Sequence, residues 1–158
     1  MRNSRIAGCG LVMVVLAGAC LFAAEPPAAG GHVKPELICK DVKGVAAGGY
    51  DLVAYFTERK AVKGSARFSV KHGGAEYHFA STDHRDRFVA NPGGYLPQYG
   101  GHCSYAMGKG KMLTGDPEAW LVYKGKLYLT VSREVLALFQ TDVVSAINQA
   151  DAIWKSLN

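Results

Sequence analysis

The sequence predicts an α+β fold: two β-hairpin-plus-helix units around a central Gly-Gly-His-Cys loop, with a C-terminal helix. Three observations predict it. Apolar and polar residues alternate twice around a glycine-containing turn, a serine follows each hairpin at the start of a helix-like segment, and the last residues have helical spacing. A chain of 158 residues fits one domain with appendages.

The first unit is a hairpin over residues 67–79, in which Gly73-Gly74 supplies a two-residue turn. Ser81 then caps a helix over residues 82–90, and the Asn-Pro-Gly-Gly run at 91–94 ends that helix. The glycine turn, the serine cap and the Asn-Pro-Gly-Gly run follow one another along the chain, so they predict the order strand, strand, helix.

The second unit repeats this pattern: residues 119–131 form a hairpin with a turn at Lys124-Gly125-Lys126, Ser132 caps the next helix, and residues 142–157 form the closing helix. Four residues of the first unit have the same spacing as four of the second: Gly74, Tyr77, Ser81 and Phe88 match Gly125, Tyr128, Ser132 and Phe139. The spacing favours duplication or pseudo-symmetry; the alternative is a coincidence between two generic units.

Before the first hairpin, the block Tyr50 to Phe56 is dense in aromatic and apolar residues and predicts a buried strand or turn at the edge of the domain. Asp51 is its one charged residue. We expect its carboxylate to cap a turn or to bind backbone N–H groups.

The N-terminus has the composition of an export signal. Residues 1–24 combine a short basic start with a long apolar run, which predicts a signal peptide, residues 25–34 a flexible tether, and residues 35–158 the domain. Soluble export to the periplasm is the first interpretation, and a lipoprotein anchored at Cys20 or an uncleaved membrane anchor are the alternatives.

Charge and cysteine content narrow the function classes. The net charge is +5, and removal of residues 1–24, which hold two arginines and no acidic residue, lowers it to +3. Positive residues are interspersed with acidic ones, so we expect no nucleic-acid partner. Cys39 and Cys103 remain in the domain, either as one disulfide or as two free thiols.

The Gly-Gly-His-Cys loop and its flanks hold most of the chemically unusual residues. His102, Cys103 and Met107 offer an imidazole, a thiol and a thioether, which suit a thiophilic transition metal. We expect Gly100-Gly101 to bring Cys103 to a surface pocket, with His84 at a helix start as a further ligand. An ordinary buried turn explains the same residues.

Three blocks follow one another along the chain: residues 49–56, then Tyr77-His78-Phe79-Ala80-Ser81 with Arg87-Phe88, then residues 99–105. Together, in this order, they resemble the YHS domain family, in particular its exported, stand-alone bacterial branch. The resemblance covers about residues 48–139. It implies a small α+β domain and a metal-binding role, since related domains accompany copper-transporting ATPases.

The chain departs from that pattern at three positions. Metal-associated members of the family have cysteines where this chain has Ala54, Ala80 and His84. The implied metal site is therefore either lost or rebuilt from His84, His78, His102 and Cys103. On an extended strand, His78 alternates away from Tyr77 and Phe79 and is a poor candidate.

These observations predict an exported small binding protein that binds copper or another thiophilic transition metal through Cys103, His102, His84 and Met107. The alternative is a non-catalytic interaction module with no metal and an unknown protein partner. A thiol-dependent enzyme has least support, because no triad order and no nucleophile elbow is present. Contact with a membrane is expected only through an uncleaved signal or a lipid anchor.

A shortened protein tests the predicted boundary. Deletion of residues 1–34 should leave a soluble monomer that unfolds in one sharp thermal transition, because the predicted core begins after the tether. Calorimetry measures this directly, and a broad or absent transition would show that the boundary is wrong.

Overall fold

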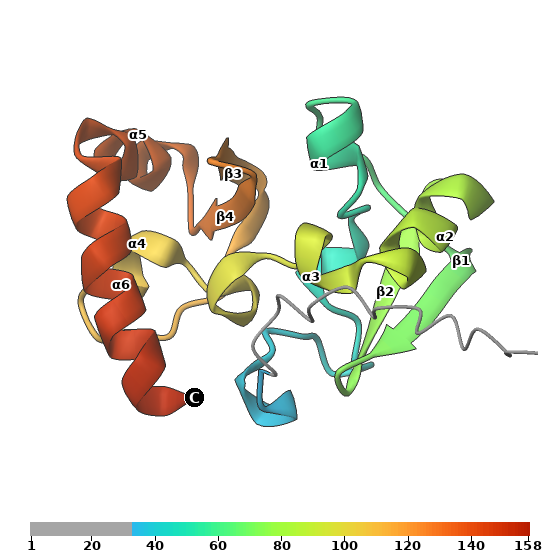
Figure 1. The fold of residues 1–158 in the computed structure, drawn as a ribbon, viewed down its shortest axis with the longest axis horizontal. Coiled ribbons are helices and arrows are strands. Elements are labelled where there is room, and N and C mark those ends of the chain that lie inside the picture. Colours follow the sequence, from blue (N-terminus) through green and yellow to red (C-terminus); the bar gives the residue numbers. More distant parts are fainter. Residues whose placement is uncertain (1–32) are drawn as a thin grey trace, which may run out of the picture.

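The computed structural model describes residues 33–158, which form two lobes side by side (Figure 1). The first lobe, residues 45–95, contains η2 (Ala47–Gly49), α1 (Ala54–Thr57), β1 (Ser65–His72), β2 (Ala75–Phe79), α2 (Thr82–Ala90) and α3 (Pro92–Tyr95). The second lobe, residues 97–157, contains η3 (Gln98–Gly101), α4 (Ser104–Met107), β3 (Asp116–Tyr123), β4 (Lys126–Thr130), α5 (Arg133–Thr141) and α6 (Val143–Leu157). A short 3-10 turn, η1 (Pro35–Leu37), precedes them. The predicted α+β architecture is confirmed, whereas the predicted signal segment lies outside the described residues.

Each lobe has one antiparallel hairpin, as predicted. The β1–β2 turn is Gly73-Gly74 with φ of 58° and 85°, and the β3–β4 turn is Lys124-Gly125 with φ of 48° and 74°. Two left-handed residues match the twist of a tight hairpin. The second turn is one residue shorter than predicted, because Lys126 already pairs with Tyr123. β3 also begins earlier than expected, at Asp116.

The predicted serine caps are confirmed. Ser81 Oγ accepts a hydrogen bond from the backbone N–H of His84 at 3.2 Å, and Ser132 Oγ accepts one from Val135 at 3.3 Å. Each bond satisfies a donor that the first turn of the helix leaves free. Asn91 ends α2 as expected, but its side chain also caps the short helix α3.

The repeat extends beyond the hairpins and caps to the turns that precede them. In the first lobe, residues 47–49 all have positive φ, and residues 99–101 do the same 52 positions later. After these turns, Asp51 N–H donates to Val62 O at 2.9 Å, and Cys103 N–H donates to Leu113 O at 2.8 Å. The predicted pseudo-symmetry of the backbone is thus confirmed, and it makes Cys103 the structural counterpart of Asp51.

The core has two clusters that meet at β4. Leu127 and Leu129 of β4 pack into the cluster around Phe79 and Phe88, while Tyr128 packs with Phe139 of the second lobe. Because strand side chains alternate between faces, β4 serves both lobes. In the described part of the chain, no helix is long and apolar enough to span a membrane.

Candidate functional site

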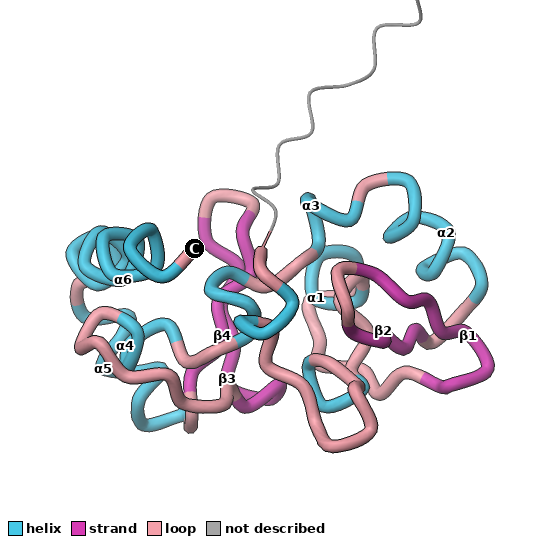
Figure 2. Tube along the Cα trace, turned by 90° about the horizontal axis from the view of Figure 1, so that it is seen from below, coloured by secondary structure: helices cyan, strands magenta, loops and turns pink. Residues whose placement is uncertain are grey.

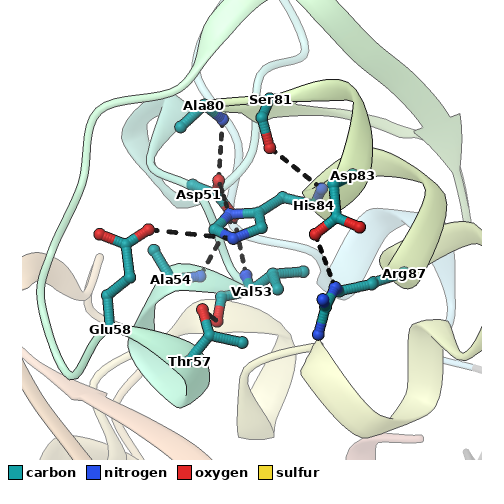
Figure 3. Close-up of polar contacts among 10 residues, drawn as sticks. All are labelled: Asp51, Val53, Ala54, Thr57, Glu58, Ala80, Ser81, Asp83, His84 and Arg87. Carbon is teal, nitrogen blue, oxygen red and sulfur yellow. Dashed lines mark hydrogen bonds and ion pairs between the residues drawn. The ribbon is translucent and has the colours of Figure 1, made fainter.

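A fully buried carboxylate, that of Asp51, joins three elements of the first lobe (Figure 3). Oδ1 accepts hydrogen bonds from the backbone N–H groups of Val53 at 2.9 Å and Ala54 at 3.3 Å, at the start of α1. Oδ2 accepts from Ala80 N–H at 2.8 Å, after β2, and from His84 Nδ1 at 2.7 Å, in α2. Four donors offset the cost of burying the charge. The sequence prediction that Asp51 binds backbone N–H groups is confirmed.

Asp51 fixes the orientation of the His84 ring. Since a carboxylate only accepts, Nδ1 carries the proton, and in the neutral ring the free lone pair is on Nε2. That nitrogen lies 3.8 Å from Oε1 of Glu58, and the two side chains are 13% and 45% exposed. A carboxylate on one ring nitrogen and a lone pair on the other, in a partly exposed side chain, is the arrangement of metal-binding and proton-transferring histidines.

The second lobe shows that this backbone does not require the polar pair. The counterpart of Asp51 is Cys103, whose Sγ accepts a hydrogen bond from Ala106 N–H at 3.4 Å, and the residue 51 positions after His84 is Val135. The same turn and helix therefore form around a thiol and an aliphatic side chain. Formation of this turn and helix therefore does not by itself account for the Asp51–His84 pair.

Three positions singled out by the YHS resemblance converge on Asp51. The backbone nitrogens of Ala54 and Ala80 and the ring of His84 all bond to its carboxylate. These are the positions at which the resemblance implies cysteines in metal-associated members. The sequence separates them by up to 30 residues, and only the fold places them together.

Cys103 is not at a surface pocket, and the prediction that glycines would expose it is wrong. Its side chain is 0% exposed and its sulfur caps α4. The side chain follows the left-handed turn at 99–101 by two positions and is buried, as Asp51 is two positions after the matching turn at 47–49. Met107 is also 0% exposed and packs against Tyr128 and Phe139, so it serves the core.

Both ring nitrogens of His102 are buried, and within residues 33–158 neither forms a hydrogen bond. Burial lowers the pKa of His102 below its ordinary value, and the nearby backbone groups of Leu113 and Leu37 oppose the shift. An imidazole buried without a hydrogen bond is costly and is open to a ligand.

The remaining candidates have structural partners or stand alone. Cys39 and Cys103 are both free thiols, so the disulfide alternative is not formed in this structure. Nε2 of His78 lies 2.9 Å from Glu76 Oε1, two residues earlier on the same strand. Within residues 33–158, no three His, Cys, Asp or Glu side chains are grouped as a metal site would need. The structure therefore does not bring the four predicted ligands together.

Sequence reasoning missed Glu58 and the Asp51–His84 pair. Glu58 stands in the charged run Glu58-Arg59-Lys60, which is typical of a solvated connection, and the separation of 33 residues between Asp51 and His84 gives no sign of contact. The repeat contained a usable signal, since the second unit has no Asp–His combination at the matching positions.

Comparison of the chain with protein-family models, with curated proteins and with solved structures finds no match. The resemblance to YHS domains therefore rests on the sequence blocks quoted above.

Replacement of Asp51 tests how much its carboxylate contributes to the stability of the fold. Asp51→Ala should lower the free energy of unfolding by about 3–5 kcal/mol, because it leaves His84 and three backbone N–H groups without an acceptor. Urea unfolding provides the measurement. Asp41→Ala is the matched control, since Asp41 Oδ1 also accepts two backbone N–H groups but in an exposed turn. Equal losses for both variants would contradict the assignment.

The lowered pKa of His102 predicts a pH effect on stability. As pH falls through about 6.5, the unfolded chain binds a proton that the folded protein resists, so stability present at neutral pH is lost on acidification. His102→Phe should reduce this loss between about pH 7.5 and about pH 5.5 and should leave stability at neutral pH equal or higher. Thermal unfolding across that range measures both effects. His72→Phe, the same substitution at an exposed position, is the control.

Proposed function

We propose that this chain is an exported, non-catalytic binding protein of the YHS type that holds a transition-metal ion, copper first, at His84. The observation that carries the proposal is the buried Asp51 carboxylate 2.7 Å behind Nδ1, which leaves Nε2 facing Glu58. A histidine that ligates metal commonly donates its other ring N–H to a carboxylate.

The internal repeat supports a functional role for this pair. Cys103 and Val135 occupy the matching places in the second lobe and the backbone there is the same, so folding alone does not explain a buried Asp–His pair. The convergence of positions 54, 80 and 84 on Asp51 agrees with the place that the resemblance implies for a metal.

The potential ligands around His84 differ in chemistry from the thiol of Cys103. An imidazole and a carboxylate suit Cu(II), whereas a thiolate suits Cu(I). Access differs too, because Cys103 would have to leave the core and give up its cap on α4 before it could bind. His84 is the better placed of the two.

The second candidate is a metal-free interaction module. The four hydrogen bonds to Asp51 favour it, because they satisfy the buried carboxylate and link three elements of the first lobe without a metal ion. Export is part of both proposals and rests on residues 1–24, with the periplasm as the compartment and a lipid anchor at Cys20 as the alternative.

A copper titration separates these proposals. His84→Gln should weaken Cu(II) binding about tenfold or more in competition with a chromophoric chelator, since it removes the oriented ring nitrogen. Cys103→Ser and the control His72→Gln should bind Cu(II) like the parent.

The same set of variants decides the alternatives. If Cys103→Ser alone abolishes anaerobic Cu(I) binding while Cys39→Ser binds normally, the site is the one predicted from the sequence. If natively purified protein carries no metal and no variant differs from the parent, the interaction module is the correct interpretation.

A further inference from the structure

A second candidate site lies between the two lobes and shares no residue with the site around Asp51, Glu58 and His84. It is a cavity of about 610 Å³ that faces the C-terminal half of α6, the turn of the second hairpin and the segment between α3 and η3. Figure 2 shows the C-terminal end of α6 beside the β3–β4 turn. This volume is within the range of small-molecule sites.

The cavity depends on a difference between the lobes. α3 follows α2 in the first lobe as α6 follows α5 in the second, but α3 has 4 residues and α6 has 15. Asp151, Trp154 and Lys155 line the cavity from that added length. The first lobe has no helix that could form such a wall.

A paired acid forms one polar part of the lining. The hydroxyl of Tyr99 donates to Asp151 Oδ1 at 2.8 Å. Burial raises the pKa of Tyr99, and the hydrogen bond and charge of Asp151 add to the effect, so the phenol stays protonated. The negative charge of Asp151 is therefore partly offset within the wall.

Two cations of the lining have no such partner. Lys126, from β4, and Lys155, from α6, both line the cavity, and neither forms an ion pair with any residue in the range 33–158. They come from different elements, and among the charged side chains of the lining they outnumber Asp151 by one. A monoanion would balance these three side chains.

The apolar part of the lining favours a flat body on the ligand. Trp154 packs edge-on against Tyr99, with ring centroids 6.0 Å apart, and Leu96 and Pro97 line the cavity as well. Aromatic rings contribute large contact areas at such surfaces.

We infer that this cavity binds a small organic monoanion with an aromatic body, its anionic group at Lys126 and Lys155 and its ring against Trp154, Leu96 and Pro97. The inference is independent of the metal proposal, because none of its residues belongs to the Asp51–His84 pair.

Indole-3-acetate is the probe, titrated into the full-length protein and followed by heteronuclear NMR. It should bind saturably and shift the indole N–H signal of Trp154 more than that of Trp120, which lies in β3 outside the cavity lining. Indole-3-acetamide, which has the same ring without the charge, should bind about fivefold more weakly.

Lysine variants locate the anionic group. Lys126→Gln and Lys155→Gln should each weaken binding of indole-3-acetate by up to about fivefold and leave the amide unaffected. Lys60→Gln, at an exposed position of the first lobe, should behave like the parent. Equal binding of acid and amide, equal behaviour of all three variants, or shifts away from Trp154 would each overturn the inference.

Discussion

The first lobe depends on one buried carboxylate. Asp51 is inaccessible to solvent, and it holds the start of α1, the end of β2 and the first turn of α2 through four hydrogen bonds. A charge in that position is tolerated only because every donor is already in place. The same hydrogen bonds fix the ring of His84, whose Nε2 lies 3.8 Å from Oε1 of Glu58.

The two lobes share a backbone and differ in chemistry. Both have three consecutive left-handed residues, an inward side chain after them, a hairpin and a serine-capped helix. In the first lobe the inward side chain is Asp51 and bonds a histidine, whereas in the second it is Cys103 and bonds only Ala106 N–H. This internal comparison separates what the fold needs from what the first lobe adds.

Strand β4 joins the two lobes. β4 contributes Leu127 and Leu129 to one core cluster and Tyr128 to the other, so the lobes form one unit. The two ends of the described chain meet nearby, since Lys34 Nζ donates to Leu157 O at 3.2 Å and Lys34 N–H donates to Asn158 Oδ1 at 3.2 Å. α6 thus closes the domain and also forms a wall of the cavity.

The sequence by itself determined the local elements: the hairpin at Gly73-Gly74, the caps at Ser81 and Ser132, the closing helix and the repeat. Each is specified by short-range signals, because turn glycines, cap hydroxyls and apolar periodicity act within a few residues. Only the tertiary structure decided the site. Whether a cysteine points inward or outward depends on the φ angles of the turn before it, and the pairing of Asp51 with His84 depends on how two distant elements pack. Long-range packing of this kind leaves no periodic trace in the sequence, so Cys103 looked reactive and is buried, while His84 was recognised but its partners were not.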